Sequence, residues 1–498
     1  MRGDRLNPSS LSHGTSRPRH DAIVVGAGPN GLAAATVLAL HGLDVVVVEA
    51  SDRAGGAVRS AELTVPGFLH DVCSAVHPMA AGSPLLRQLP LQEHGLRWIQ
   101  PPIPLAHPLD GERCVTIRRS LEETASALGS DGPAWKAMVG GLSSDWEMLA
   151  EDFLGPLLRW PSHAVRMARL GLRGLPSASG SIRRAFATEE ARAVLAGCSA
   201  HSFLPLDRIA SAGVGVVLAA AAHAVGWPIP AGGSGALADA MVAHLRSLGA
   251  QVRLGWRVAD LDELPSARAI LLDLTSRQVA TVAASRLPER YLRRLGRYRY
   301  GPGVVKMDWA LDGPVPWLHE ECGQAATVHL GGSLSELEHS ERLPWEGDIS
   351  ERPFVLFAEP SRFDPSRAPE GKGVGWGYCH VPHGWDGDVP WIVARIEAQV
   401  ERFAPGFTGR ILQRSVRTPA QLQAGNPNLI GGDINGGVQD LRQLFARPVL
   451  SLDPYSTPAR DLYICSSSTP PGGGVHGMCG YHAARSALRR SFGIVASL

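Results

Sequence analysis

Three glycines at the spacing of a dinucleotide-binding turn stand near the N-terminus, at Gly26, Gly28 and Gly31. The first permits a tight turn after a strand, the second lets the backbone approach a pyrophosphate at a helix start, and the third lets helix and strand pack closely. Glu49 follows a run of four valines. At the end of a second strand its carboxylate can accept both hydroxyls of an adenosine ribose, and it would repel a 2′-phosphate. These residues predict binding of a dinucleotide without a 2′-phosphate.

A glycine pair follows the predicted ribose acid. Gly55 and Gly56 stand between Arg53 and Arg59. Such an extension suits a cofactor whose long axis continues past the edge of the sheet, which favours FAD over NAD. The alternative interpretation is a plain glycine turn with a surface arginine.

A third glycine-rich segment lies near the C-terminus, where Gly472–Gly474 lead through Val475 and His476 into a predicted helix. The backbone N–H groups at the start of a helix face negative charge. A reduced flavin carries such charge at N1 and the neighbouring carbonyl oxygen, so we expect this segment to meet the flavin ring. A glycine turn without a ligand is the alternative.

Two histidines are the candidate catalytic residues. His380 lies on a predicted strand that could face the flavin, and a neutral imidazole can act as a base near neutral pH. His476 stands at the helix start that we expect to meet the flavin. His70 and His77 are weaker candidates. For all four the alternative is a structural histidine whose hydrogen bonds are satisfied.

The hydrophobic pattern predicts the elements that must position these residues. Residues 21–49 form a strand, a glycine turn, a helix and a strand buried on both faces, which is one complete βαβ unit. Residues 106–225 carry apolar side chains mostly at helical intervals. Residues 301–440 alternate short apolar runs with Gly and Pro turns, as a mixed sheet would. A strand at Leu462–Cys465 precedes the last helix, at about Gly477–Arg490.

The composition is that of a globular protein. The chain has 498 residues, 44% of them hydrophobic and 19% charged, with a formal net charge of +1. Electrostatics therefore gives no reason to expect nucleic acid as a partner. The seven cysteines include no CxxC pair, so we expect no metal site, disulfide framework or reactive dithiol.

The N-terminal segment and the longest apolar run bear on localisation. Residues 1–20 are polar and lack an apolar core segment, so we expect a disordered leader rather than a secretory signal. No run reaches the length of a membrane span, and Ala212–Trp227, which comes nearest, is expected to be a buried helix. We expect a cytoplasmic protein, with peripheral membrane contact and a homodimer as open alternatives.

The glycine segments together resemble the phytoene-desaturase-like FAD-dependent oxidoreductases, which share the amine-oxidase type of fold. The residues that carry the likeness are Val24–Gly31, Glu49–Arg59 and Leu462–Ala484. A closer likeness is to the branch of that family that contains pyridine nucleotide-disulfide oxidoreductase domain-containing protein 2. It rests on the segments 301–309, 367–371, 375–382, 401–407 and 470–480.

This resemblance implies an α/β fold with a Rossmann-type FAD-binding domain and an interleaved α+β substrate domain. The FAD-binding domain would be discontinuous, at residues 21–105, 226–300 and 441–498. The substrate domain would have a helical part at 106–225 and a mixed-sheet part at 301–440. The implied FAD contacts are Gly26, Gly28, Pro29, Asn30, Gly31, Glu49, Ala50, Arg53, Gly56, Ala57, Arg59, Val258, Gly474, Val475 and His476.

Two features depart from the broader family. The span Val252–Asp273 leaves little room for the β-meander usually found there. Cys465–Ser468 stands where many relatives have Gly-Asp. We therefore expect hydroxyls of Ser466 or Ser467, together with backbone N–H groups, to replace a carboxylate contact to the cofactor.

The predicted reaction is oxidation or desaturation of a largely apolar small molecule by hydride transfer to flavin N5. Because only one GxGxxG lies within a predicted βαβ unit, at Gly26–Gly31, we expect the electrons to pass to O₂ or a quinone. A flavin amine oxidase is one alternative, and it would need an aromatic cage to which Trp376 and Tyr378 could contribute. A non-catalytic flavoprotein and a redox-neutral isomerase of the same fold stay open.

Overall fold

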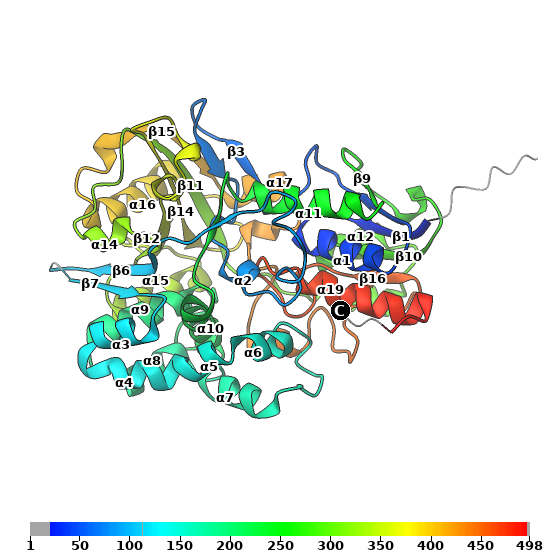
Figure 1. Ribbon diagram of the computed structural model, residues 1–498, viewed down its shortest axis with the longest axis horizontal. Coiled ribbons are helices and arrows are strands. Elements are labelled where there is room, and N and C mark those ends of the chain that lie inside the picture. The colour runs from blue at the N-terminus through cyan, green and yellow to red at the C-terminus, as the bar shows by residue number, and fades with distance from the viewer. Residues whose placement is uncertain (1–19, 112, 496–498) are drawn as a thin grey trace, which may run out of the picture.

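The computed structural model describes residues 20–111 and 113–495. Figure 1 shows two adjoining parts, each built on its own sheet. The N-terminal strands and the C-terminal helix, blue and red, lie together on the right, so the two ends of the chain build the same part. The predicted leader lies outside the described residues except for His20, which is the first residue of a strand.

The first sheet has five parallel strands in the order β16-β10-β1-β2-β9. Its strands are β1 (His20–Val25), β2 (Val45–Val48), β9 (Gln251–Arg253), β10 (Ala267–Leu272) and β16 (Leu462–Ile464). Since β1 lies between β2 and β10, the carboxyl ends of these three strands meet at one edge. Open α/β sheets bind their ligands at such an edge.

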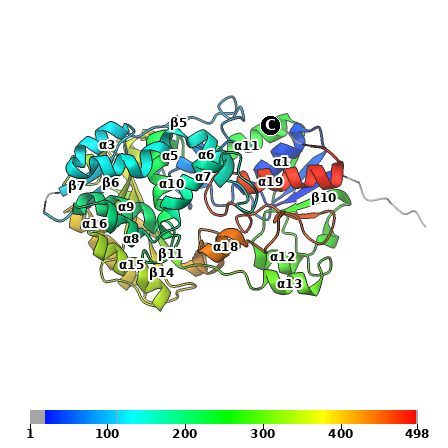
Figure 2. The same ribbon diagram turned by 90° about the horizontal axis from the view of Figure 1, so that it is seen from below.

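Helices cover both faces of this sheet. One face carries α1 (Pro29–Leu40), α11 (Gly235–Ser247) and α19 (Met478–Ala487), and the other carries α12 (Ser276–Val282) and α13 (Glu289–Leu295) (Figure 2). Val24 and Val47 pack toward the first group, whereas Ile23 and Val46 pack toward the second. This alternation follows from the opposite orientation of successive side chains along a strand. The predicted Rossmann-type α/β fold is confirmed.

The second sheet has seven strands in the order β15-β11-β14-β13-β12-β6-β7. It is mixed, because β6 runs parallel to β12 and the other neighbours are antiparallel. Its strands are β6 (Ile103–Leu109), β7 (Arg113–Ile117), β11 (Gly303–Leu311), β12 (Ala325–Leu330), β13 (Val355–Ala358), β14 (Gly373–Val381) and β15 (Ile411–Arg417). One face packs on α16 (Val389–Phe403), and the other packs on helices from residues 121–224.

The helical part of the chain begins later than the sequence pattern predicts. A helical segment is predicted from residue 106, but β6 and β7 form a hairpin in the mixed sheet and that start is wrong. All seven residues of β6 are buried, since pairing with β12 on one side and β7 on the other places the strand inside the sheet. The local pattern of this segment is ambiguous, so its strand structure is set by pairing with residues far away in the chain.

The helices that follow lie against the second sheet and against each other. They are α3 (Leu121–Ala127), α4 (Gly132–Trp135), α5 (Gly141–Ser144), α6 (Trp146–Phe153), α7 (Ala164–Gly174), α8 (Ala178–Ala185), α9 (Glu189–Ala200) and α10 (Ser211–Ala224). α10 contains most of the apolar run that comes nearest to a membrane span, and most of its residues are buried, as expected. Within the described ranges, every helix is too short or too polar to cross a bilayer.

The remaining helices and strands lie within the mixed-sheet part or in the segments between the two sheets. They are α2 (Pro78–Ala81), α14 (Glu320–Gly323), α15 (Leu334–Glu346), α17 (Pro419–Gly425), α18 (Leu441–Phe445) and the two-stranded pairs β3 (Ser60–Glu62) with β4 (Leu69–Asp71) and β5 (Trp98–Ile99) with β8 (Ile229–Pro230). Between β9 and β10 the described chain forms only a single 3-10 turn at Leu261–Glu263, in keeping with the short span. The predicted domain boundaries stay a prediction.

Candidate functional site

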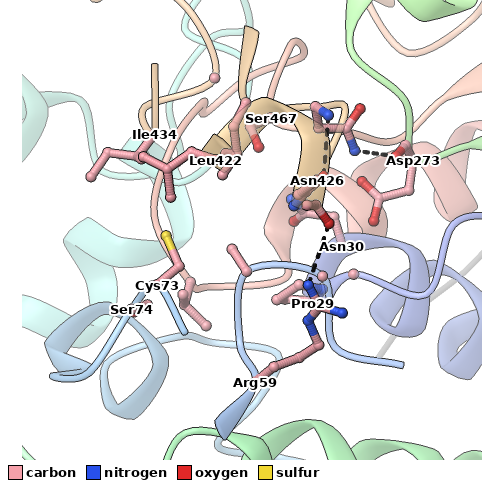
Figure 3. A pocket seen from close by; sticks show the side chains of 18 of the residues that line it. Pro29, Asn30, Arg59, Cys73, Ser74, Asp273, Leu422, Asn426, Ile434 and Ser467 are labelled. Atoms are coloured by element: carbon pink, nitrogen blue, oxygen red, sulfur yellow. Dashed lines mark hydrogen bonds between the residues drawn. The ribbon is translucent and has the colours of Figure 1, made fainter. Parts of the chain in front are cut away.

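A cavity of about 500 Å³ connects the carboxyl edge of the parallel sheet with one face of the mixed sheet. Figure 3 shows Asp273 beside Asn30, and on the opposite side Cys73, Leu422 and Ile434. Thirteen of the fifteen predicted cofactor residues line the cavity: Gly26, Gly28, Pro29, Asn30, Glu49, Ala50, Arg53, Gly56, Ala57, Arg59, Val258, Gly474 and Val475. Gly31 and His476 are the two that do not. The predicted residues are thus mostly neighbours in space.

The glycine turn and the ribose acid are held together by hydrogen bonds. Gly26, which follows β1, has a φ of +104°, a conformation that favours glycine. Glu49 accepts hydrogen bonds from the N–H of Ala27 at 2.7 Å and of Ser51 at 2.8 Å. These bonds fix the carboxylate at the end of β2, beside the start of α1, where an adenosine ribose would lie.

A second acid, Asp273, also stands at the glycine turn. Its Oδ2 atom accepts a hydrogen bond from the N–H of Gly31 at 3.0 Å, and the side chain is buried. Burial raises the pKa of Asp273 to about 7, and the nearby charge of Glu49 adds to the rise. Sequence reasoning missed this residue. The available signal was an acid directly after the strand that borders β1, at the edge where ligands bind.

The arginine segment continues the cavity away from the turn. A Cβ at Gly56 would lie 3.0 Å from the Cα of Gly28, so the two glycine segments are in close contact. Arg59 donates to the Ser51 hydroxyl at 3.0 Å, while its buried Nε atom has no hydrogen-bond partner among the described residues. The buried Oδ1 atom of Asn30 likewise has none in the described structure. Polar atoms left unpaired beside a glycine cradle fit a bound flavin dinucleotide.

The C-terminal glycine segment meets the cavity before α19 begins. Gly474 and Val475 line it, whereas His476 is buried behind them. Nδ1 of His476 accepts a hydrogen bond from the N–H of Met478 at 3.0 Å. Burial lowers the pKa of His476 to about 4. The catalytic role of His476 stays a prediction, and in the structure its ring secures the start of the helix.

The serines that follow β16 differ in position and in hydrogen-bond partner. Ser467 lines the cavity, as Figure 3 shows. Ser466 donates to the carbonyl of Leu274 at 2.7 Å, and the Ser468 hydroxyl accepts from the N–H of Ser276 at 3.1 Å. Of the two predicted replacements for a carboxylate contact, Ser467 faces the cavity and Ser466 secures the loop after β10.

Apolar side chains line the half of the cavity that borders the mixed sheet. They are Leu218, Trp227, Val304, Leu356, Trp376, Tyr378, Leu422, Leu429 and Ile434.

Lys306, on β11, is the one lysine or arginine among the described residues that lines this half. It forms a buried ion pair with Asp308 and donates to the carbonyl of Asp71 at 2.6 Å. Burial lowers the pKa of Lys306 and raises the pKa of Asp308 to about 6, while their attraction opposes both shifts.

His380 lies one strand position beyond the cavity. It shares the face of β14 with Trp376 and Tyr378, as expected from alternation along a strand, but it is not a lining residue. Its Nδ1 atom is 2.6 Å from Glu341 Oε2, and Phe203 covers its ring at 3.9 Å. The catalytic role of His380 stays a prediction, and its position offers no direct route to a molecule in the cavity.

Two other imidazoles do line the cavity. His77 is held between Ser74 and Ser234, and its Nε2 lies 2.8 Å from the Ser234 hydroxyl. His201 contacts His329 through a 2.9 Å distance between their Nε2 atoms. Burial, helped by the charge of His380, lowers the pKa of His201 to about 3. Its Nδ1 forms no hydrogen bond within the described structure.

His70 and the aromatic pair complete the predicted candidates. His70 lies outside the cavity lining and contacts Thr64 at 2.7 Å through Nε2. Its pKa is lowered to about 3, chiefly by burial and also by Lys306. The rings of Trp376 and Tyr378 are 5.4 Å apart at an interplanar angle of 89°. Two rings at that angle do not form parallel walls on either side of a substrate.

The chain is similar to known flavin-dependent oxidoreductases. The profile of the family described as flavin containing amine oxidoreductase matches residues 30–404. Pyridine nucleotide-disulfide oxidoreductase domain-containing protein 2 of Mus musculus is 26% identical over 575 residues, which covers 96% of this chain and 95% of that protein. Phytoene desaturase (neurosporene-forming) of Rhodobacter capsulatus is 25% identical over 500 residues, with 92% of each chain covered.

One solved structure illustrates the likeness in fold. An oxidoreductase from Methanosarcina mazei superposes with a TM-score of 0.62 at 16% sequence identity, covering 94% of this chain and 100% of that one. The resemblance inferred from the three glycine segments is confirmed.

Proposed function

The chain belongs to the flavin containing amine oxidoreductase family, and from that membership we propose that it is an FAD-dependent dehydrogenase or oxidase of a largely apolar small molecule. The observation that carries this proposal is one continuous cavity, which has a dinucleotide-type turn at one end and an apolar chamber at the other. A hydride donor in the chamber would lie against the flavin end of the bound dinucleotide.

The residues at the glycine-turn end of the cavity are suited to binding FAD. The amides at the start of α1 would face the diphosphate, Glu49 would accept hydrogen bonds from the ribose hydroxyls, and the unpaired Nε of Arg59 would supply a further donor. Bound there, FAD would supply a hydride acceptor at N5. Gly474 and Val475 would present backbone N–H groups to the ring edge on which negative charge develops on reduction.

The residues at the apolar end of the cavity exclude water and accept the proton that the reaction releases. Leu356, Trp376 and Ile434 are among the side chains that enclose the substrate. When a C–H bond gives up its hydride, desaturation also releases a proton. His201 lines the chamber, and in the tautomer whose Nε2 donates to His329 its Nδ1 is the atom we assign to receive that proton. Burial lowers the pKa of this ring to about 3, so the ring is neutral before the reaction and, as a weak base, holds the proton only in transit to solvent.

The proposal is tested by anaerobic mixing of the purified holoprotein with two panels of compounds. One panel contains polyenes and unsaturated lipids, and the other contains monoamines and diamines. We expect rapid loss of the oxidised-flavin absorbance with a member of the first panel. Bleaching by amines alone would establish the amine oxidase instead.

The amine oxidase is the second candidate, because the matching family is named for amines. The perpendicular rings of Trp376 and Tyr378 count against an aromatic cage built from this pair.

Photoreduction of the flavin without reaction in either panel would favour a non-catalytic flavoprotein. Conversion of a compound without net flavin reduction would favour an isomerase.

We propose O₂ or a quinone as the electron acceptor. Mixing the reduced protein with air-saturated buffer, and separately with a soluble quinone under anaerobic conditions, measures the two rates of reoxidation. Peroxide formed in proportion to substrate identifies an oxidase. Fast reoxidation by the quinone alone identifies a dehydrogenase.

A further inference from the structure

Helix α7 exposes apolar side chains to solvent. Val165 is 68% exposed and Leu172 is 79% exposed, and Trp160, four residues before the helix, is 85% exposed. Single exposed apolar side chains are ordinary on a protein surface, whereas several on one face of a helix need an explanation. Figure 1 places α7 at the lower edge of the molecule, away from the parallel sheet.

These side chains form one stripe. Positions 165, 172 and 175 recur at helical intervals, so Val165, Leu172 and Leu175 lie on the same side of α7. Ile209 extends the stripe, because its neighbour Ala210 donates a hydrogen bond to the carbonyl of Leu175 at 2.7 Å. We call the exposed apolar side chains of α7 and its flanking segments the α7 surface; they are Trp160, Val165, Leu172, Leu175 and Ile209.

The other side of α7 is anchored to the protein by polar and apolar contacts. Met167 and Leu170 pack against the core, Arg166 forms an ion pair with Asp145 at 3.0 Å, and Arg173 donates to the carbonyl of Ala137 at 2.7 Å. The outward orientation of the apolar stripe is therefore fixed by contacts on the inner side.

Cationic side chains accompany the stripe. Arg159 and Arg169 are exposed, and neither forms an ion pair within the described structure. Glu151 and Asp207 are the exposed acids closest in sequence to its two ends. An apolar helix face bordered by arginines, with a tryptophan at its end, has the composition of a helix that lies in the interface of an anionic bilayer.

We propose that the α7 surface docks the protein on the surface of an anionic lipid bilayer. Trp160, Val165 and Leu172 would enter the acyl boundary, while Arg159 and Arg169 would contact phosphate groups. α7 packs on α10, and Leu218 of α10 lines the apolar chamber. The docked face would thus lie beneath the chamber wall. The purpose of docking, access to an apolar substrate dissolved in the bilayer, rests on the proposed function.

The test is flotation of the holoprotein with vesicles of phosphatidylcholine alone or mixed with phosphatidylglycerol. We expect at least tenfold stronger partition onto the anionic vesicles. The double variant Trp160→Ser/Leu172→Ser should lower this partition at least tenfold. The matched control is Leu318→Ser/Leu412→Ser, which changes two exposed leucines of the mixed-sheet region and should float like the wild type.

The charge contribution is tested separately. Arg159→Gln/Arg169→Gln should lower partition onto anionic vesicles about five- to tenfold while leaving binding to phosphatidylcholine alone unchanged. FAD content and melting temperature of every variant establish that it is folded. As a measurement on the unaltered protein, hydrogen exchange of residues 158–175 should slow when anionic vesicles are added.

Absence of flotation by the wild type, or equal flotation of all variants, would overturn the proposal. A second copy of the chain is the competing occupant of the α7 surface. If analytical ultracentrifugation shows a dimer that Trp160→Ser/Leu172→Ser dissociates, and vesicles do not compete with it, the surface is a dimer contact. Vesicle binding without any substrate oxidation would leave docking intact and refute only the proposed function.

Discussion

A side chain at Gly28 would enter space that is already occupied. A Cβ built there lies 2.6 Å from Oδ2 of Asp273, and it would also point toward the expected diphosphate. We predict that Gly28→Ala weakens FAD binding roughly 10- to 100-fold, since each factor of ten corresponds to about 1.4 kcal/mol. Titration of apoprotein with FAD, followed by quenching of flavin fluorescence, measures the dissociation constant.

The control for this variant is Gly409→Ala, whose added Cβ meets nothing within 4 Å. It should bind FAD like the wild type. Equal affinity of Gly28→Ala and the wild type would mean that the diphosphate does not approach this turn.

Asp273 makes stability depend on pH. Its pKa is raised from 3.8 to about 7 by burial, so the native state binds more protons than the unfolded chain between pH 4 and 7. The free energy of unfolding therefore falls as pH rises through that window and levels off above it. We predict that Asp273→Asn stabilises the apoprotein more at pH 8 than at pH 5, at about 1.4 kcal/mol per pKa unit removed. Urea unfolding at the two pH values measures this difference.

The same ionisation should weaken the cofactor site, because an ionised Asp273 repels a diphosphate. FAD affinity of the wild type is expected to fall above pH 7, and that of Asp273→Asn to stay nearly constant. Glu359→Gln is the matched control, since Glu359 is a buried carboxyl with a pKa raised to about 7 that does not line the cavity. Identical pH profiles for all three proteins would contradict this assignment.

His201 and His380 can be separated by kinetics. Only His201 lines the chamber, whereas His380 is bound to Glu341. We predict that His201→Gln slows single-turnover flavin reduction by at least 100-fold, within the usual range for loss of a general base, and that His380→Gln changes it less than threefold. The reverse order of effects would make His380 the base, as the sequence predicts.

At the scale of elements, the crossing of α1 and α19 depends on a helical glycine. A Cβ at Gly480 would lie 1.9 Å from the carbonyl oxygen of Asn30, so the two helices are in backbone contact. We predict that Gly480→Val destabilises the protein by about 3 kcal/mol or more, at the upper end of overpacking effects, and lowers FAD content. The melting temperature of the apoprotein measures the first effect.

Gly141→Ala is the corresponding control. Gly141 begins α5 with open space at its Cβ, and the change should alter stability by no more than about 1 kcal/mol. A melting temperature for Gly480→Val that matches this control would show that α19 can move away from α1 without cost.

The strand β14 explains why one predicted residue missed the cavity. Its even-numbered side chains face the chamber side, where Trp376 and Tyr378 form the wall. His380 continues the same face, but Phe203 and Glu341 cover it from neighbouring elements. Alternation along a strand gives the face of a residue, while the elements packed above it decide what that residue can touch.

At the scale of the whole molecule, the cofactor cavity joins distant parts of the chain. Residues 25–59, 256–282, 422–436 and 467–475 all contribute to its lining. A ligand that contacts them together binds only the folded state. We predict that FAD at 100 times its dissociation constant stabilises the protein by about 2.7 kcal/mol. Differential scanning fluorimetry should show one transition that shifts upward with FAD concentration, and an unchanged melting temperature would refute FAD binding.

The sequence by itself determined the βαβ unit, the glycine turn, the acid at the end of β2 and the likeness to flavin oxidoreductases. These features lie within residues 20–59 or in one further glycine segment, and short-range geometry is enough to predict them. The same holds for most strands of the mixed sheet, whose apolar runs are bounded by turns.

Only the tertiary structure decided that Asp273 meets Gly31, that His201 lines the chamber, that β6 and β7 belong to the mixed sheet, and that α7 faces outward. Each of these depends on contacts between residues far apart in the chain. Such contacts form when separate elements bury their apolar faces against one another, and a local pattern of residue types cannot specify which elements will meet.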